Sequence, residues 1–268
     1  MDFAQHYGPW AIVAGASEGT GRELARKIAA QGVRCILVAR RAEPLAALAG
    51  EIRAESGVEC VTASIDLSAP DAADRIAAAA GEREIGLYVS NAGADTVGAG
   101  FFERPVSAWL EMTQLNALTA MRCCHHFGAL MRERRRGGIL LVNSGACYSG
   151  ANGMAAYSAG KGFLLNLGES LWAELRGSDV HVLNLILGRT DTPAFRKSLA
   201  ETGQPVPANI ASPVEVAAIG LARLAHGPTY NWGQEDELVG YAPTSAATRR
   251  ARVEMIERAT NALFGRGQ

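Results

Sequence analysis

Tyr157 and Lys161 are the two residues whose types and spacing most directly suggest chemistry. Residues four apart on a helix lie on one face, so the phenol and the ammonium can reach the same small volume. Lysine is scarce here, with three lysines against twenty-three arginines. A tyrosine with an ordinary pKa of about 10 becomes a usable proton donor and acceptor when a cation favours its ionised form. The pair predicts acid–base chemistry, with a helix aromatic beside a solvated lysine as the alternative.

A glycine-rich stretch near the amino terminus predicts a nucleotide site. Gly15, Gly19 and Gly21 follow a short apolar run and lead into an amphipathic stretch of helix length. Glycine permits a tight turn and a close approach of backbone amides to a pyrophosphate, and the start of the helix favours the anion. An ordinary strand-to-helix turn is the alternative, but the position after the first strand of an alternating pattern favours a dinucleotide cofactor.

Both features belong to an alternation of short apolar runs with amphipathic stretches, which is typical of a parallel sheet covered by helices. The fold class predicted is α/β, a single doubly wound parallel-sheet (Rossmann) domain with helices on both faces and an extra C-terminal helical tail. The expected strands are 10–15, 33–40, 58–65, 86–93, 137–145 and 179–187. The expected helical stretches are 21–32, 44–57, 104–135, 155–176, 213–225 and 244–264.

We expect one domain over residues 1–268, because no linker, internal repeat or low-complexity tract interrupts the pattern. Its core spans about 9–225. A Thr- and Pro-rich stretch at about 189–212 is expected to form a loop over the substrate, and about 227–268 forms the tail.

The composition excludes several classes of partner. The chain is 48% hydrophobic and 20% charged with a formal net charge of −1, so it offers no general attraction to nucleic acid or to an anionic membrane. The sequence contains no run of eighteen apolar residues, so no membrane span is predicted. Five cysteines without CxxC spacing indicate neither a disulfide framework nor a zinc site, and we expect a cytoplasmic protein. Cys123, Cys124, His125 and His126 are adjacent on a predicted helix and point in different directions, so no metal site is expected there.

The glycine spacing GxxxGxG and an ordered set of further motifs resemble the short-chain dehydrogenase/reductase family over about residues 9–225. These motifs are Asp66, Asn91-Ala92-Gly93, Asn116, Ser144 thirteen residues before Tyr157, Lys161, and Gly188 to Thr192. A weaker resemblance, in the opening YGPWAIV and the final helix, points to the hydroxysteroid and 3-ketoacyl reductase branches. The resemblance implies an oxidoreductase that interconverts a carbonyl and a secondary alcohol on an apolar small molecule.

The resemblance also implies roles for individual residues. Tyr157 protonates the carbonyl oxygen as the nicotinamide delivers hydride, Ser144 donates a hydrogen bond to that oxygen, and Asn116 supports a proton-relay water near Lys161. The cofactor is expected on Gly15, Ser17, Glu18, Gly19, Thr20, Gly21, Arg40, Arg41, Asp66, Leu67, Asn91, Ala92, Gly93, Tyr157, Lys161, Gly188, Thr190 and Thr192. The substrate is expected on Ser144, Cys147, Tyr148, Met154, Tyr157 and Phe195. For Cys147 and Tyr148, plain packing is an equal alternative.

The end of the second strand favours NADP(H) over NAD(H). An acidic side chain there would bind the ribose hydroxyl, but the position is Ala39, and Arg40 and Arg41 follow it. Both guanidiniums can make charge-assisted bonds with a 2′-phosphate. Glu18 opposes this preference because a carboxylate near the adenine ribose repels a phosphate. The alternative is that the two arginines are solvated charges.

Three departures from the family pattern precede the tail: Ala14, Ser90 and Leu187 replace a threonine, an asparagine and a proline. We expect the first two to weaken a hydrogen bond between the glycine loop and the Asn91-Ala92-Gly93 turn. The usual final strand also looks absent, so a homodimer paired through 104–135 and 155–176 is expected in preference to a tetramer. Two other functions stay open: a non-catalytic dinucleotide-binding sensor, and a sugar epimerase or dehydratase.

Overall fold

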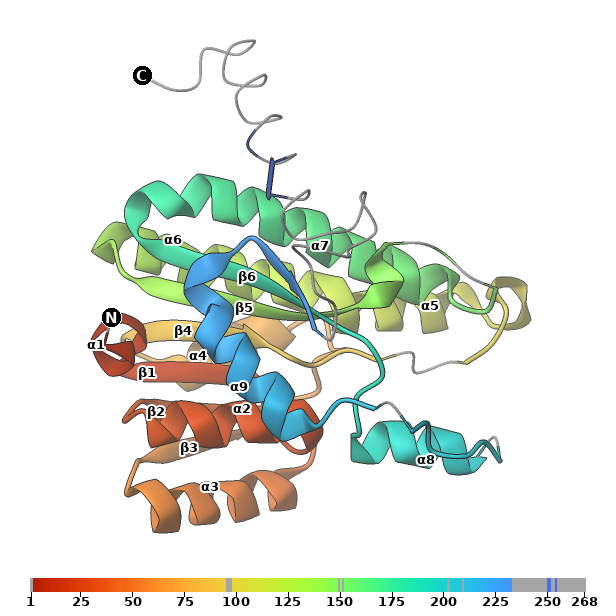
Figure 1. The fold of residues 1–268 in the computed structure, drawn as a ribbon, viewed down its shortest axis with the longest axis horizontal. Helices are drawn as coiled ribbons and strands as arrows, with labels where there is room; N and C mark the ends of the chain where they lie inside the picture. The colour runs from red at the N-terminus through yellow and green to blue at the C-terminus, as the bar shows by residue number, and fades with distance from the viewer. Residues whose placement is uncertain are drawn as a thin grey trace.

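Seven parallel strands form one sheet in the order β3-β2-β1-β4-β5-β6-β7 (Figure 1). This computed structural model describes residues 2–94, 98–148, 150, 152–201, 203–208, 210–232, 250–251 and 254. The strands are Trp10–Ala14 (β1), Arg34–Ala39 (β2), Cys60–Ser64 (β3), Ile85–Ser90 (β4), Gly137–Ser144 (β5), Val180–Leu187 (β6) and Thr229–Asn231 (β7). The order reverses between β1 and β4, so the sheet is doubly wound as predicted, with the switch point beside the glycine loop.

Helices cover both faces of the sheet (Figure 1). They are Phe3–Tyr7 (α1), Gly19–Ala30 (α2), Ala42–Ser56 (α3), Ala72–Ala80 (α4), Val106–Thr113 (α5), Thr119–Arg134 (α6), Ala155–Leu175 (α7), Pro193–Glu201 (α8) and Pro213–Arg223 (α9). A π-helical turn, Gln114–Leu118 (η2), joins α5 to α6, and short 3-10 turns lie at Phe101–Glu103, Gly145–Cys147, Arg176–Ser178 and Leu224–His226. No helix of the described residues is long and apolar enough to cross a membrane.

Two predictions about the later part of the chain were wrong. A final strand is present, because β7 pairs with β6 through Asn184, Leu185 and Ile186, and the sheet has seven strands instead of six. Its three residues are too few to show an apolar strand pattern in the sequence. The stretch 189–212, expected as a loop, contains α8. Most of the predicted tail helix, 244–264, lies outside the described residues.

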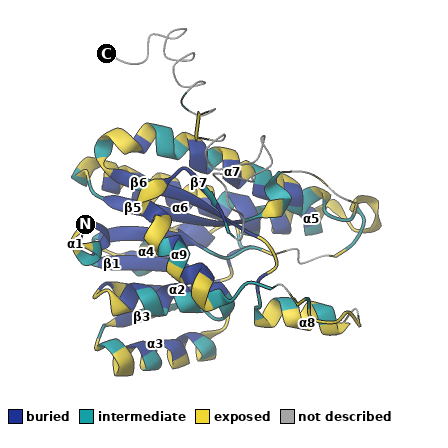
Figure 2. Cartoon of the chain, in the orientation of Figure 1, coloured by how far each residue is buried: buried dark blue, intermediate teal, exposed yellow. Residues whose placement is uncertain are grey.

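Alternate residues of each strand pack on opposite faces, which produces two apolar cores. Ala11, Val13 and Leu37 face α2, α3 and α9, while Ile12, Ile36 and Val38 face α4 and α6. Burial on both faces explains why the strands read as continuous apolar runs. Figure 2 shows most of the strand residues as buried and the outward faces of the helices as exposed, whereas the edge strand β3 is buried only at Cys60.

Close packing of α7 on the sheet sets the position of the Tyr157 and Lys161 backbone. Gly168 faces β5 and β6 so closely that an added Cβ would lie 2.8 Å from Leu141 Cδ1. Within the same layer, Asn143 Nδ2 donates to the Lys161 carbonyl at 3.1 Å. The start of α7 is therefore held at the carboxyl end of β5.

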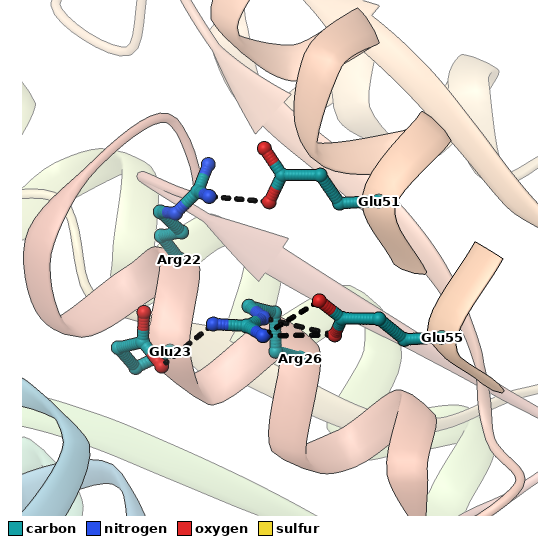
Figure 3. A network of polar contacts seen from close by, with 5 residues as sticks. All are labelled: Arg22, Glu23, Arg26, Glu51 and Glu55. Carbon is teal, nitrogen blue, oxygen red and sulfur yellow. Dashed lines mark hydrogen bonds and ion pairs between the residues drawn. The ribbon is translucent and has the colours of Figure 1, made fainter. Parts of the chain in front are cut away.

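Ion pairs join α2 to α3 on the outer surface (Figure 3). Arg22 pairs with Glu51, and Arg26 pairs with Glu55 at 2.7 Å. Within α2, Arg26 also lies 3.7 Å from Glu23. Because these side chains are partly exposed, each pair contributes only about 0.2–1 kcal/mol. Their consequence is local: they hold α2, whose first turn forms part of the glycine loop, against its neighbour.

Candidate active site

The glycine loop folds back on itself at the carboxyl end of β1. Gly15 has a positive φ of 89°, and its N–H and that of Ala16 both donate to the Val38 carbonyl, at 2.7 and 3.1 Å. A Cβ on Gly21 would overlap the Gly15 carbonyl oxygen, so only glycine fits there. The side chain of Glu18 makes no capping hydrogen bond at the start of α2. The first-turn amides therefore point toward the loop, as anion binding requires.

The residues after β6 reach the same loop. A Cβ on Gly19 would lie 2.8 Å from Thr192 Cγ2, so Thr192 sits directly over the start of α2. Thr190 is buried and forms an isolated parallel β-bridge with Ala211. The Thr192 N–H donates to the Thr190 carbonyl at 2.8 Å. The structure thus brings the predicted Gly188-to-Thr192 segment and the glycine loop together across about 170 residues of sequence.

Backbone hydrogen bonds tie the turn after β4 to the glycine loop. The N–H groups of Asn91 and Ala92 donate to the Ala14 carbonyl at 3.0 and 2.9 Å, and Asn91 Nδ2 donates to the Gly15 carbonyl at 3.0 Å. The Ala14 carbonyl, which any residue offers, makes this connection, and the weakening expected from the lost threonine side chain stays a prediction. Gly93 completes the turn with φ of 156°.

The adenosine side carries opposing charges that neutralise one another. Arg41 Nη2 lies 2.5 Å from Glu18 Oε2 and 3.4 Å from Ser17 Oγ, so the carboxylate expected to repel a phosphate is paired. Arg40 remains exposed beside this pair. Ala39, at the end of β2, is buried and offers no carboxylate.

Asp66 and Leu67 follow β3 at the expected edge. Burial alone would raise the pKa of Asp66, but hydrogen bonds from the Ser68 N–H and hydroxyl, helped by Arg40 and Arg75, lower it instead. Asp66 is therefore held ionised and fixed in orientation. The Leu67 side chain is buried, and its carbonyl accepts from Thr119 Oγ1 at 2.9 Å, which links this edge to α6.

Lys161 is the most unusual ionisable group of the site. Its side chain is buried, with Nζ 3.4 Å from the Val142 carbonyl and 5.8 Å from the centroid of the Tyr157 ring. Burial lowers the pKa of Lys161 from 10.5 to about 8, against a smaller opposing influence of Cys147. The ammonium can therefore change charge near physiological pH, which arginine could not do.

Asn116 lies next to Lys161 on a distorted helix. It belongs to the π-helical turn η2, where its side chain is buried and its Nδ2 donates to the carbonyls of Ala94 and Met112. A Cβ on Gly93 would lie 2.6 Å from Asn116 Oδ1 and 2.8 Å from Lys161 Nζ, so the two atoms face a common space. Asn116 Oδ1 is buried and has no hydrogen-bond partner among the described residues. Buried acceptors are normally satisfied, so this oxygen marks a place for a donor.

Ser144 ends β5 and begins the turn Gly145–Cys147. Its Oγ accepts from the Ala146 N–H at 3.2 Å, and its own N–H donates to Asn143 Oδ1 at 2.8 Å. Asn143 thus holds both Ser144 and, through Nδ2, the Lys161 backbone. Sequence reasoning missed Asn143, although an amide inside an otherwise apolar strand was a signal that could have found it.

The other residues predicted to bind substrate lie on the loop after β5, at the start of α7 and on α8, and they make different hydrogen bonds. Cys147 and Tyr148 are half-buried, and the Tyr148 hydroxyl donates to Asn231 Oδ1 at 2.6 Å, across to the end of β7. Met154 precedes α7. Phe195 is on α8, where its N–H donates to Thr192 Oγ1 at 3.2 Å. Asn231, another residue that sequence reasoning missed, couples the seventh strand to the loop after Ser144.

The run from Cys123 to His126 points in two directions. The two cysteines are buried in the core, while both histidines line a hollow of about 390 Å³ between α4 and α6, with Asp74 and Arg122. The four side chains therefore do not converge on one point, as expected for adjacent helical residues.

The arrangement fits a nicotinamide dinucleotide. The glycine turn and the uncapped start of α2 suit a pyrophosphate, and the arginine-rich end of β2 suits the adenosine end. At the other end, Tyr157, Lys161 and the unpartnered Asn116 Oδ1 lie beyond the Asn91-Ala92-Gly93 turn. Residues at that end, Tyr157 above all, suit proton transfer to a substrate bound beside the cofactor.

Comparison with known proteins agrees with this geometry. The family model described as short chain dehydrogenase matches residues 9–203. The chain belongs to the short-chain dehydrogenase family. A 7beta-hydroxysteroid dehydrogenase from Collinsella aerofaciens is 34% identical over 199 residues, which cover 74% of this chain and 75% of that protein. The predicted resemblance to the family and to its hydroxysteroid branch is confirmed.

Two further relatives of this short-chain dehydrogenase bear on its function. A solved structure described under 7beta-hydroxysteroid dehydrogenase stereoselectivity superposes with a TM-score of 0.82 and 28% identity, covering 96% of this chain and all of that one. A rat protein named inactive hydroxysteroid dehydrogenase-like protein 1 is 30% identical over 187 residues, 69% of this chain and 57% of its own. Because one of these relatives is named inactive, membership of the family does not by itself establish catalytic activity, and the site residues must be considered.

The lowered pKa of Lys161 predicts a pH-dependent contribution to stability. Between about pH 8 and 10.5 the unfolded chain keeps a proton on Lys161 that the folded chain has released, so stability rises with pH there. Relative to Lys161→Met, the cofactor-free wild type should gain up to about 1.4 kcal/mol per pH unit across this window and nothing below it. Urea unfolding of both proteins at several pH values measures the difference, and parallel curves would contradict the assignment.

Proposed function

We propose that this short-chain dehydrogenase is an NADP(H)-dependent oxidoreductase that interconverts a carbonyl and a secondary alcohol on an apolar small molecule. The observation that carries the proposal is the buried Lys161 ammonium beside Tyr157, with Asn116 Oδ1 facing the same space. The hydroxysteroid relative makes a steroid ketone or alcohol the first substrate class to test. A hydride-transfer assay over steroid, aliphatic and aromatic ketones and alcohols, followed by nicotinamide absorbance, tests the activity.

In this mechanism Tyr157 transfers the proton, and Lys161 and Ser144 stabilise the charges that develop. A bound reduced nicotinamide supplies the hydride that reaches the carbonyl carbon. Tyr157 gives its phenolic proton to the carbonyl oxygen, and Lys161 stabilises the phenolate left behind. Ser144 Oγ donates a hydrogen bond to the oxygen as its charge grows. In the oxidising direction Tyr157 accepts the proton instead.

Asn116 completes the route by which Tyr157 recovers its proton. Its Oδ1, which has no hydrogen-bond partner among the described residues, and Lys161 Nζ both border the place where a side chain on Gly93 would lie. A water bound by both groups would pass a proton from solvent toward Lys161 and from there to Tyr157. The Asn116 amide is held by two carbonyls, so the acceptor oxygen is fixed toward this space.

The intact set of Asn116, Ser144, Tyr157 and Lys161 argues against a non-catalytic sensor. A sensor needs the glycine loop and could use Lys161 to hold the nucleotide, but it has no use for a hydroxyl and a phenol, Ser144 and Tyr157, placed for proton transfer beside that lysine. A sugar epimerase or dehydratase is disfavoured by the GxxxGxG spacing. The hydride-transfer assay separates these functions, because a sensor binds nucleotide without turnover and an epimerase shows no net change in nicotinamide absorbance.

Tyr157→Phe should lower kcat by about 10²–10⁴-fold, because the proton donor is lost while the nucleotide contacts remain. Cofactor affinity, measured by fluorescence titration, should stay within about twofold of the wild type. Tyr230, a half-buried tyrosine of β7, provides the matched control, and Tyr230→Phe should keep the wild-type rate. Lys161→Ala should damage both turnover and cofactor binding. A Tyr157→Phe enzyme with a tenth of the wild-type rate would show that another group is the acid.

For the cofactor we propose a preference for NADP(H) that depends on Arg40. The ion pair between Arg41 and Glu18 neutralises the carboxylate but also occupies Arg41, whereas the exposed Arg40 is available to a 2′-phosphate. A well-formed bond of this kind contributes about 1.5 to 3 kcal/mol.

The wild type should use NADP(H) at least about tenfold more efficiently than NAD(H), which corresponds to about 1.4 kcal/mol. Arg40→Ala should remove most of this difference by weakening NADP(H) alone. Glu18→Gln should enlarge it by releasing Arg41, while Glu23→Gln, further along α2, should leave it unchanged. Comparison of kcat/KM for both cofactors tests the series, and a wild type that prefers NAD(H) would show that another contact governs the ribose pocket.

We also propose a homodimer paired through α5, α6 and α7. The presence of β7 removes the argument from a missing final strand. The proposal rests instead on exposed apolar side chains of these helices, which are Leu110, Met121, Leu130 and Phe163. Light scattering at micromolar concentration should give twice the chain mass, and Phe163→Glu with Leu110→Glu should give the monomer. A monomeric wild type would contradict the dimer. The five free cysteines support a cytoplasmic location.

A further inference from the structure

A cluster of histidine and aspartate side chains lies at the amino end of the sheet, opposite the end that carries Tyr157 and Lys161. His6 comes from α1, Asp179 from the turn before β6, and His181 from β6 itself. His6 Nδ1 is 3.9 Å from Asp179 Oδ2, and His181 Nε2 is 3.7 Å from Asp179 Oδ1. Among the described residues, this is the group of three metal-ligating side chains whose donor atoms all lie within 4.8 Å of one another.

Burial around the cluster is graded from the interior to solvent. The His6 side chain is 9% exposed, that of His181 18% and that of Asp179 64%. The two imidazole rings stack with centroids 4.5 Å apart and planes 17° from parallel, and each has one ring nitrogen near the Asp179 carboxylate, at 3.9 Å for His6 and 3.7 Å for His181. His6 Nε2 is buried and has no hydrogen-bond partner among the described residues. An ion could therefore reach the cluster from solvent past the exposed Asp179.

An outer hydrogen bond orients His181. The Tyr7 hydroxyl lies 2.7 Å from His181 Nδ1. When Nδ1–H donates to this hydroxyl, the lone pair of Nε2 is left on the side of Asp179. Metal-bound histidines commonly have such a partner on the second ring nitrogen, which fixes the tautomer and the ring.

The backbone of Asp179 also suits a fixed ligand. Asp179 adopts a left-handed conformation with φ of 55°, which aspartate tolerates better than most residues. Its N–H donates to the Arg176 carbonyl at 3.3 Å. In this conformation the Asp179 carboxylate lies 3.7 Å from His181 Nε2, so the turn directs Asp179 to the same side as His181.

We propose that His6 Nδ1, His181 Nε2 and an Asp179 carboxylate oxygen bind a zinc ion, with water as the fourth ligand. Two imidazoles and one carboxylate are donors that zinc accepts and that magnesium and calcium do not favour. Zinc bonds of about 2.0–2.1 Å place tetrahedral ligands about 3.3–3.5 Å apart. The contacts of the two histidines with the carboxylate, at 3.9 and 3.7 Å, need only a small contraction, but the stacked His6 ring must also turn so that both ring planes meet at the ion. This proposal is independent of the oxidoreductase function.

The consequence of binding would be a clamp between the amino terminus and β6. Tyr7 and His181 are 174 positions apart in sequence, so the unfolded chain does not present the ligands from α1 and β6 together. Zinc bound by the folded form alone shifts the folding equilibrium toward that form. Zinc binding should therefore raise the thermal stability of the folded protein.

The experiment uses the full chain, free of cofactor and of any histidine tag. Zinc chloride titrated calorimetrically should bind at one ion per chain, and saturation should raise Tm by about 5 °C, reversibly with a chelator. Magnesium at the same concentration should have no effect. Asp179→Asn, which keeps the exposed position and tolerates the left-handed backbone, should weaken zinc binding at least tenfold, and so should His6→Gln. His125→Gln, an exposed histidine on α6, is the matched control and should bind as the wild type does.

Two results would overturn the site. One is a wild type with no saturable zinc binding. The other is zinc binding that survives in both Asp179→Asn and His6→Gln or is lost in His125→Gln, since the ion would then bind elsewhere. Turnover of ketones plays no part in either measurement, so failure of the oxidoreductase assay leaves this result interpretable.

Discussion

The buried ammonium of Lys161 is the constraint around which the catalytic end of the molecule is arranged. A charged group removed from water is costly, and the Val142 carbonyl at 3.4 Å offsets only part of that cost. The result is a lysine whose pKa falls to about 8. Such a group is tolerated where it does chemistry, because ligand groups can supply the interactions that the protein alone does not.

Several elements are needed to keep that lysine beside Tyr157. Gly168 allows α7 to approach β5, and Asn143 joins the Lys161 backbone to Ser144 at the end of the strand. The π-helical turn directs Asn116 to the same space from the other side. Helices α5 to α7 therefore position the acid–base groups, while the glycine loop and β2 form a separate, charge-bearing end for the nucleotide. A change in α7 packing should disturb turnover more than adenosine recognition.

The two ends of the sheet perform different tasks. At the carboxyl end, backbone hydrogen bonds join loops that follow β1, β4 and β6, which leaves their side chains to meet a ligand. At the amino end, α1 brings His6 and Tyr7 against the start of β6. Parallel strands make this division possible, because all their carboxyl ends share one edge of the sheet.

Local pattern determined the fold class, the first six strands, and the main catalytic and glycine-loop candidates, because buried parallel strands leave continuous apolar runs and a glycine loop leaves a fixed spacing. It also placed Tyr157 and Lys161 on one helical face. It did not reveal β7, α8, the role of Asn143 or the Glu18–Arg41 pair. These depend on contacts between residues far apart in the chain or on elements too short to show a period. The His6–Asp179–His181 cluster has the same origin: His6 is separated from its two partners by more than 170 residues, and only the sheet brings them together.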